Sequence, residues 1–367
     1  MINRILFHIN SLGKGGAERV MVNLTETLAM MGKECIIATE WYDEDEYPLD
    51  KSVRRIDVGA GDKASELSGS ALRRFRREKL HKAILEEKPD VIVAFCRNAN
   101  YRAILAARNT GVKVIFSVRS DPKTDYASLK QRILSGILYR RAAGAVFQTP
   151  DAASFFSGIM KDRSTVILNP LNSKYLNAPR VEKRRNVIVT AGRFHEAKDQ
   201  LTLLKAFKLI SEEYKDINLE MFGSESGDNT YSLLKKYISE NGLSERVIFR
   251  GNSNSLEKDI TDARIFVLSS KYEGMPNALM EAMAMGIPVL STDCPCGGPA
   301  MLIRHGENGL LTAVGDERMM ASGLRELLED PERAERLGEN ARELCKKAAP
   351  LEIASQWISF MEKCTGY

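Results

Sequence analysis

Residues 263–293 form the segment that most constrains the fold of this chain. The runs IFVLSS and IPVLST are short and rich in β-branched residues, which is typical of buried parallel strands. The segment between them is too long for a hairpin and has the length of a crossover helix. Pro276 suits the first turn of that helix and Asn277 can cap it, whereas Gly286 suits the left-handed position beyond its last turn. The segment therefore predicts a strand, helix, strand unit of a parallel sheet.

Two glutamates in this unit are candidates for ligand binding. The predicted helix over 278–285 is apolar on every side except at Glu281, so we expect it to be buried, and a buried carboxylate needs a partner. Glu273 precedes the helix in a loop at the carboxyl end of a strand, where open α/β sheets place their ligands. The alternative is that Glu281 pairs with an internal Arg or Lys while Glu273 is solvated. The spacing of both around a Gly-Met-Pro-Asn helix start favours a ligand with hydroxyl groups.

Length and composition limit the class of protein. At 367 residues, with 44% hydrophobic and 28% charged residues, the chain is expected to form two globular domains. A formal net charge of +4 is too small to predict nucleic-acid binding. No apolar run approaches the roughly 20 residues of a membrane span and no secretory signal is evident, so we expect a cytoplasmic protein. The six cysteines lack paired metal-site spacing and are expected to be reduced.

Predicted strands and helices alternate through both halves of the chain, which indicates an α/β fold with two doubly wound parallel-sheet domains facing each other. A polar stretch without periodicity follows the Asn-Pro pair at 169–170 and marks the boundary between them. The expected domains are residues 1–172 and residues 173–351.

A glycine-rich loop follows the first predicted strand, residues 2–9. Gly13, Gly15 and Gly16 stand before a helix, where backbone amides and the helix N-terminus can approach an anion. The spacing is not that of a dinucleotide site, because Glu18 stands in place of the third glycine. A tight turn that requires small residues and an anion-binding loop are equally favoured.

Arg193 and Lys198 follow the first strand of the second half, in AGRFHEAKD. Because strand ends meet at one edge of a parallel sheet, both cations can reach Glu273 and the start of the helix that follows it. An Arg fork, a mobile Lys charge and helix amides together form a diphosphate site. The alternative is that the two cations neutralise Glu273 and Glu281 as internal ion pairs.

The segment EGMPNALMEAMAMGIPVLSTD resembles the signature of the retaining family 4 glycosyltransferases, whose E-x7-E spacing falls on Glu273 and Glu281. The resemblance extends from GGAERV near the start of the chain to STDCPCGGP and GENGLL near its end. It implies the GT-B fold, with two facing Rossmann-like domains. It also implies that the first domain binds the acceptor, that the second binds the nucleotide sugar, and that a C-terminal helix at 352–367 crosses back onto the first domain.

The resemblance gives each candidate residue a role. Arg193 and Lys198 would hold the donor diphosphate, Glu281 the ribose hydroxyls, and Glu273 would lie beside the donor sugar. Many members carry a His near the sugars at the exit of the strand VKVIFSVRS, where this chain has Arg119; with Glu273, Arg193 and Lys198 it completes the predicted catalytic set. The other predicted donor contacts are Gly15, Gly16, Asn252, Gly274, Met275, Asn277 and Ala278.

The resemblance implies a retaining transferase that moves a hexose or N-acetylhexosamine from a nucleotide sugar, expected to be a UDP sugar, to a sugar hydroxyl of a lipid-linked or polysaccharide acceptor. No cofactor and no catalytic metal are expected, because the Asp43-Glu44-Asp45 motif lies in an acidic run typical of a solvated loop. The leaving diphosphate would instead be stabilised by cations and helix amides in a front-face mechanism. The alternatives are a nucleotide-sugar epimerase of the same architecture and a non-catalytic nucleotide-sugar-binding partner of another transferase.

Two basic stretches lie in the first half, at 71–82 and 130–141, and each is interleaved with apolar residues. Such a stretch is usually a solvated helix face. The alternative is peripheral contact with anionic lipid at the inner-membrane surface.

Overall fold

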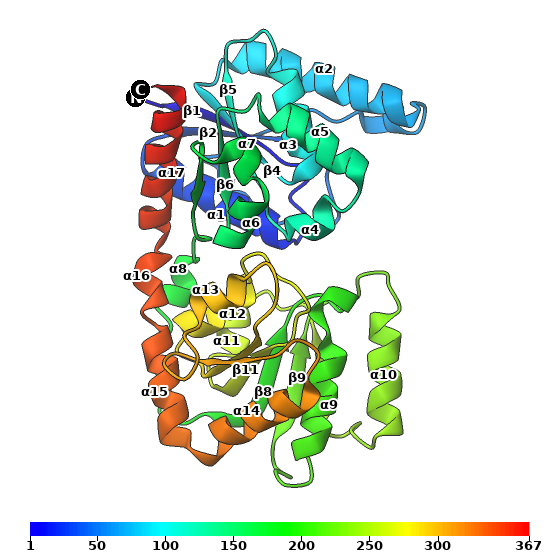
Figure 1. Ribbon diagram of the computed structural model, residues 1–367, viewed down its shortest axis with the longest axis vertical. Coiled ribbons are helices and arrows are strands. Elements are labelled where there is room, and N and C mark those ends of the chain that lie inside the picture. The colour runs from blue at the N-terminus through cyan, green and yellow to red at the C-terminus, as the bar shows by residue number, and fades with distance from the viewer. Residues whose placement is uncertain (367) are drawn as a thin grey trace. The chain divides into compact units, whose positions relative to one another are not determined.

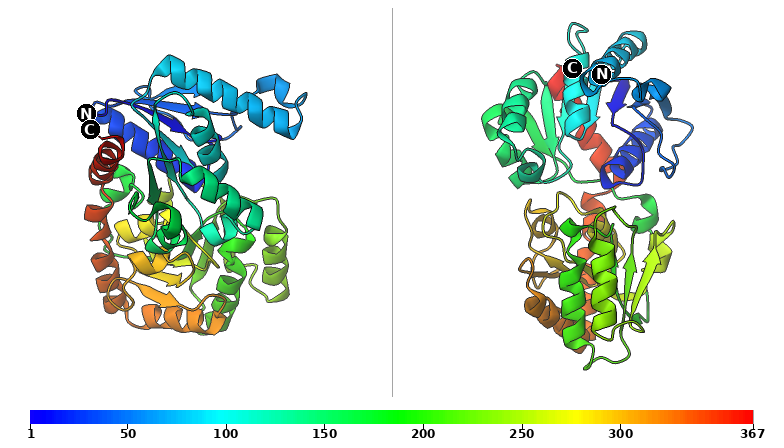
Figure 2. Two further views of the ribbon diagram at one scale, coloured as in Figure 1. Left: turned by 45° about the horizontal axis from the view of Figure 1, so that its top comes forward. Right: turned by 90° about the vertical axis from the view of Figure 1, so that its right-hand side faces the viewer.

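The computed structural model describes residues 1–366, which form two compact units. Unit 1 comprises Met1–Pro170 together with the chain from Ala348 onward, and unit 2 comprises Leu171–Lys347. Each unit contains a parallel sheet flanked by helices (Figure 1, Figure 2). The predicted α/β class with two doubly wound sheets is thereby confirmed.

The sheet of unit 1 has the strand order β3-β2-β1-β4-β5-β6-β7, with all strands parallel. The order reverses between β1 and β4, so the carboxyl ends of these strands flank the place where such sheets bind ligands. The bounds are β1 (Arg4–His8), β2 (Glu34–Thr39), β3 (Arg54–Asp57), β4 (Val91–Phe95), β5 (Lys113–Ser117), β6 (Gly144–Phe147) and β7 (Ser164–Val166).

The helices of unit 1 come from both ends of the chain. C-terminal α17 packs against α1 and β5, and its Trp357 lies in the core at 1% exposure. None of the helices described within residues 1–366 has both the length and the apolar character needed to cross a membrane. The bounds are α1 (Gly16–Met30), α2 (Gly69–Glu87), α3 (Arg97–Ala106), α4 (Pro122–Asp125), α5 (Leu129–Tyr139), α6 (Pro150–Phe155), α7 (Ser157–Met160) and α17 (Pro350–Thr365).

The sheet of unit 2 has the order β10-β9-β8-β11-β12-β13, again all parallel, and its reversal lies between β8 and β11. Its strands are β8 (Arg185–Ala191), β9 (Asn218–Phe222), β10 (Val247–Gly251), β11 (Ala263–Leu268), β12 (Val289–Thr292) and β13 (Leu310–Thr312). Its helices are α8 (Ser173–Leu176), α9 (Gln200–Ile210), α10 (Thr230–Glu240), α11 (Leu256–Asp259), α12 (Asn277–Ala284), α13 (Gly298–Leu302), α14 (Glu317–Glu329), α15 (Pro331–Ala341) and α16 (Leu344–Lys347).

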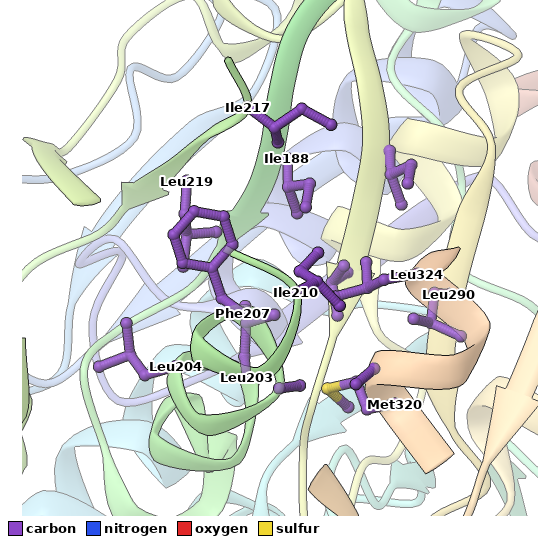
Figure 3. Packing of buried hydrophobic residues seen from close by; sticks show 14 of the residues in the cluster. Ile188, Leu203, Leu204, Phe207, Ile210, Ile217, Leu219, Leu290, Met320 and Leu324 are labelled. Atoms are coloured by element: carbon purple, nitrogen blue, oxygen red, sulfur yellow. The ribbon is translucent and has the colours of Figure 1, made fainter. Parts of the chain in front are cut away.

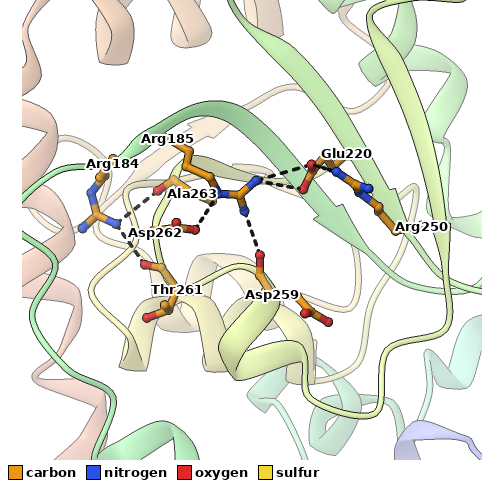
Figure 4. Close-up of polar contacts among 8 residues, drawn as sticks. All are labelled: Arg184, Arg185, Glu220, Arg250, Asp259, Thr261, Asp262 and Ala263. Atoms are coloured by element: carbon orange, nitrogen blue, oxygen red, sulfur yellow. Dashed lines mark hydrogen bonds and ion pairs between the residues drawn. The ribbon is translucent and has the colours of Figure 1, made fainter.

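Alternating side chains of the unit 2 strands have different surroundings. Ile188 and Leu219 join an apolar core with Phe207 of α9 and Leu324 of α14 (Figure 3). Glu220, the next residue of β9, is buried at 4% exposure and is neutralised from the two neighbouring strands, by Arg185 at 3.4 Å and by Arg250 (Figure 4). A buried carboxylate requires such partners.

The start of α12 differs from the sequence prediction. Asn277 is the first helical residue and Pro276 stands at the N-cap position, where no side chain caps the helix. The sequence predicted Pro276 in the first turn and Asn277 as the cap. This assignment was wrong, because the extended backbone of Pro276 (φ −80°, ψ 100°) ends the preceding loop rather than beginning the helix. The predicted burial and termination are confirmed: Leu279–Ala284 are buried, and Gly286 adopts φ +74°.

Candidate active site

The candidate site of unit 2 lies in the loops after β8 and β11, the two strands at which the order of its sheet reverses. The loop after β8 carries Arg193 and then Lys198, which ends a 3-10 turn over Glu196–Lys198. The loop after β11 carries Glu273 and leads into α12. Chain segments 75 residues apart thus converge at the usual ligand position of a doubly wound sheet.

Lys198 and Glu273 form an ion pair in this position. The Lys198 ammonium contacts Oε1 of Glu273, and the Ser270 hydroxyl donates a hydrogen bond to the same oxygen at 2.7 Å. The Lys198 side chain is 30% exposed and that of Glu273 is 12% exposed, so the pair is reachable from solvent. The internal ion pair considered from the sequence is therefore present for these two residues.

Arg193 is not part of this pair. Its side chain is exposed and forms no ion pair with any residue that the structure describes, while its carbonyl accepts a hydrogen bond from Gln200 Nε2 at 2.9 Å. The backbone of the loop is thus fixed while the guanidinium faces solvent. An exposed cation held at a strand end can bind an anion at little desolvation cost.

The loop that carries Glu273 is braced by the residues after β12. The Glu273 amide donates to the Pro295 carbonyl at 2.6 Å, and the Cys296 amide donates to the Glu273 carbonyl at 3.2 Å. Gly298 permits this approach, since a Cβ on it would lie 1.7 Å from the Gly274 carbonyl oxygen. Sequence reasoning did not assign Ser270 or this brace to the site, although STDCPCGGP is part of the family resemblance.

The two loops of the site are also joined directly. The Ser269 hydroxyl donates to the Lys198 carbonyl at 2.9 Å, and the Lys271 amide donates to the Ala197 carbonyl at 2.8 Å. His195 supports the turn between them, since its Nδ1 accepts a hydrogen bond from the Ala197 amide at 3.1 Å. The backbone around Lys198 is therefore preorganised.

The start of α12 follows Glu273 directly. Gly274 and Met275 are buried in the loop, whereas Asn277 and Ala278 in the first turn are partly exposed. The amides of a first turn carry partial positive charge and favour an anion. Glu281 lies further along the helix and is buried at 4% exposure.

Asn252 lies apart from this group. It is exposed in the loop that follows β10, at the same edge of the sheet. β9 and β8 separate β10 from β11, which corresponds to about 14 Å across three strand spacings. The distance suits a group at the far end of an extended ligand rather than one beside the Lys198–Glu273 pair.

In unit 1, Gly15 and Gly16 lie at the start of α1, where Gly15 is the N-cap residue. A Cβ on Gly15 would lie 2.1 Å from Oε2 of Glu18, so the Glu18 carboxylate folds back over the glycine. A carboxylate near a helix N-terminus is electrostatically favourable.

Arg119 lies in unit 1 beyond β5. Its guanidinium donates to Asn169 Oδ1 at 2.6 Å and to Ser117 Oγ at 3.3 Å, and it stacks 4.5 Å from the centre of the Phe95 ring. Burial lowers the pKa of Arg119 to about 10, so it remains a cation at neutral pH. Its hydrogen-bond partners are neutral, and the charge of the Glu18 carboxylate raises its pKa against the larger effect of burial.

Cysteines and acidic residues do not gather into a further centre. No group of three or more His, Cys, Asp or Glu side chains within residues 1–366 has the arrangement of a metal site. Asp45 of the D-x-D motif pairs with Lys14 at 2.6 Å. Burial and the nearby Glu273 carboxylate raise the pKa of Cys294 to about 12, so this thiol is protonated at neutral pH.

Two protein-family models together match most of the chain. Residues 14–174 match the family described as Glycosyltransferase Family 4, and residues 173–344 match the family described as Glycosyl transferases group 1. The chain is 28% identical over 342 residues to the lipopolysaccharide core biosynthesis glycosyltransferase LpsE of Rhizobium meliloti, covering 90% of each chain.

Two further matches extend over almost the full length. An α-1,4-N-acetyl-D-galactosaminyltransferase of Campylobacter jejuni, named for a diNAcBac-PP-undecaprenol-linked acceptor, is 26% identical over 369 residues, covering 98% of both chains. The crystal structure of Anabaena HepE in complex with UDP-glucose has a TM-score of 0.83 at 17% identity, covering 98% of this chain and 99% of that one. The chain therefore belongs to the family 4 glycosyltransferases and is a glycosyltransferase with the GT-B fold.

Proposed function

We propose that the protein transfers a hexose or N-acetylhexosamine from a UDP sugar to a sugar hydroxyl of a lipid-linked or polysaccharide acceptor, with retention of configuration and without a metal ion. The observation that carries the proposal is the Lys198–Glu273 pair at the reversal point of the unit 2 sheet, next to exposed Arg193 and the start of α12. The named relatives support the acceptor class, and the UDP-glucose complex of HepE supports the donor class.

We assign the donor to unit 2. Arg193, Lys198 and the amides of Gly274, Met275, Asn277 and Ala278 would hold the diphosphate. An ammonium group has three N–H donors, and Glu273 requires only one of them, so Lys198 can contact a phosphate without leaving its partner. Glu281 would bind the ribose hydroxyls, and Asn252, at the distant β10 loop, would bind the base.

The chemistry that we propose needs no protein nucleophile. As the bond from the sugar to the diphosphate breaks, the negative charge on the leaving oxygen is stabilised by Lys198, Arg193 and the first turn of α12. The acceptor oxygen forms its bond to the anomeric carbon on the same face, and the leaving diphosphate takes the proton of the acceptor hydroxyl. Glu273, whose backbone is bonded on both sides to the loop after β12, fixes the donor sugar beside this point.

We assign the acceptor to unit 1. Arg119 is a partly buried cation whose hydrogen-bond partners are neutral, which suits an anionic or strongly polar acceptor group. For Gly15 and Gly16, contact with a phosphate group stays a prediction from the resemblance. A lipid-linked acceptor would place the protein at the cytoplasmic face of the membrane.

Calorimetry with UDP, GDP and ADP tests the donor site. We expect UDP to bind with an affinity that EDTA does not change, and Lys198→Ala to weaken binding about 10- to 100-fold, the range for loss of charge-assisted hydrogen bonds. Lys271→Ala is the matched control, because this neighbouring lysine pairs with exposed Glu196 at 3.0 Å instead. Equal UDP affinity of the Lys198→Ala and wild-type proteins would remove Lys198 from the phosphate site.

A turnover assay separates the proposed activity from its alternatives. UDP-N-acetylglucosamine, UDP-N-acetylgalactosamine and UDP-galactose are incubated with an undecaprenyl-diphosphate-linked N-acetylhexosamine, and the product linkage is read by NMR. An α-linked product from an α-linked donor supports retention. Conversion of the donor without an acceptor would indicate the epimerase, and nucleotide binding without turnover would indicate the non-catalytic partner.

A further inference from the structure

Helix α5 of unit 1 presents an apolar stripe to solvent. Leu129, Ile133 and Ile137 are spaced four residues apart and therefore lie along one side of the helix over about 12 Å. With Leu134 beside them, their exposed fractions are 73% for Leu129, 55% for Ile133, 40% for Leu134 and 51% for Ile137. Single exposed apolar residues need no explanation, but a contiguous group on one short helix marks an interaction surface.

The helix that carries the stripe is firmly held. Its first turn is closed by a capping box between Ser128 and Gln131. Its inner side buries Leu138 and Tyr139, and the Tyr139 ring stacks on Phe116 with a centroid distance of 3.8 Å. The exposed residues therefore lie on a helix, α5, that is packed on the core of unit 1.

The stripe is surrounded by cations. The segment 129–141 contains Lys130, Arg132, Arg140 and Arg141 and has no acidic residue. All four are exposed, and within residues 1–366 no carboxylate lies at ion-pair distance from Lys130, Arg140 or Arg141. Apolar side chains flanked by unneutralised cations match an anionic bilayer, whose phosphates lie just above its acyl chains.

We propose that this α5 surface, Leu129, Lys130, Ile133, Leu134, Ile137, Arg140 and Arg141, docks on an anionic lipid bilayer. The apolar stripe enters the boundary between head groups and acyl chains, while the three cations contact lipid phosphates. The inference deepens the proposed function, because it names the surface by which the enzyme would reach a lipid-linked acceptor. It requires neither the UDP donor nor the roles of Lys198 and Glu273.

A second copy of the chain is a poorer occupant of this surface. A twofold contact would bring Lys130, Arg140 and Arg141 of both copies together with no carboxylate on the helix to separate them. Four apolar side chains also cover much less than the ~800 Å² per partner of a specific protein interface. Charge thus favours a lipid surface over self-association.

Vesicle co-sedimentation tests the proposal. We expect the full-length protein to bind vesicles of phosphatidylcholine with phosphatidylglycerol and to bind pure phosphatidylcholine weakly. Ile133→Ser combined with Ile137→Ser should reduce binding about tenfold or more, because two apolar side chains that would enter the bilayer are lost. Leu233→Ser on α10 is the matched control: Leu233 is 56% exposed beside Lys235 and Lys236 but has no apolar stripe around it, so vesicle binding should not change.

A charge variant tests the second element of the surface. Lys130→Gln, Arg140→Gln and Arg141→Gln together should reduce binding to anionic vesicles by roughly 100-fold, at about fivefold for each cation near the membrane. Unchanged binding of both α5 variants, or no vesicle binding by the folded wild-type protein, would overturn the proposal. Dimerisation in sedimentation experiments that Ile133→Ser abolishes would overturn it in favour of a second copy.

Measurements of UDP binding and of vesicle binding distinguish failure of the membrane-docking proposal from failure of the proposed glycosyltransferase function. UDP binding of the α5 variants, measured in the absence of lipid, should equal that of the wild-type protein. UDP binding without vesicle binding would reject the membrane surface alone, whereas vesicle binding without UDP binding would reject the donor site alone.

Discussion

His8 ends β1 inside unit 1 and faces a buried ion pair. Its Nδ1 lies 2.9 Å from the Ala38 carbonyl, so the neutral ring donates from that nitrogen, and its Nε2 lies 3.6 Å from Oε1 of Glu40. Glu40 is fully buried in its side chain and pairs with Arg102 and, at 2.9 Å, with Arg76. Burial, and then the charge of Arg102, lower the pKa of His8 from 6.5 to about 3.

This shift predicts a pH-dependent stability. The unfolded chain takes up the His8 proton near pH 6.5 and the folded chain only near pH 3, so acidification between these values favours unfolding. From pH 7 to pH 5 this group alone should remove about 2 kcal/mol of folding free energy. Urea unfolding of wild type and His8→Gln at both pH values measures it. Gln keeps a donor for the Ala38 carbonyl but does not titrate, so the variant should lose about 2 kcal/mol less; equal losses would exclude His8 as the titrating group.

Residue types and their positions in the sequence predicted part of the candidate site of unit 2. The types of Arg193, Lys198 and Glu273 and their positions after strands predicted an anion site. The contact between Lys198 and Glu273 entered the sequence analysis only as an alternative, because choosing it requires knowing that β8 and β11 are neighbours in the sheet. Ser270 gave no signal, since a serine after a strand has many structural roles.

At the scale of elements, the buried central strands were predictable, whereas the two edge strands of unit 1 were not. The central strands of both sheets are continuous apolar runs, which parallel sheets covered on both faces require. β3 and β7 were missed because they lie at the sheet edges, are short and have no fully buried residue, so neither periodicity nor an apolar run marks them. The predicted roles of Pro276 and Asn277 at the start of α12 were also wrong, because the ends of a helix depend on how the preceding loop is held.

The brace behind Glu273 makes a prediction about α13. Gly298→Ala places a methyl group 1.7 Å from the Gly274 carbonyl, and backbone must move to accept it. We expect a loss of about 1–3 kcal/mol of stability, as for overpacked sites, and weaker UDP binding, because Glu273 and the start of α12 shift with the loop. Thermal unfolding and calorimetry measure both. Gly158→Ala is the control, since a Cβ there meets no heavy atom within 4 Å; an equal effect of the two substitutions would argue against a specific brace.

At the scale of the whole molecule, unit 1 is built from the two ends of the chain and unit 2 from the middle. α17 supplies Ile353, Trp357, Phe360 and Met361 to the same core as β1 and β4. A Cβ on Gly144 of β6 would lie 2.5 Å from Cys364 Sγ, so β6 also approaches this helix closely. Unit 1 therefore cannot bury its core during synthesis until the last segment of the chain is available.

The two tryptophans of the chain allow this dependence to be measured. Trp357 of α17 is 1% exposed and contacts Phe95 of β4 with a ring-centroid distance of 5.8 Å, whereas Trp41 is 39% exposed. Trp357→Ala should cost about 3–5 kcal/mol, the range for a fully buried aromatic residue, and Trp41→Ala about 1 kcal/mol. Hydrogen exchange of the Trp357→Ala protein locates the effect: amides of β1 and β4 should lose protection while those of β8 and β11 retain it. Equal loss in both sheets would mean that the units unfold as one body and that α17 does not act on unit 1 alone.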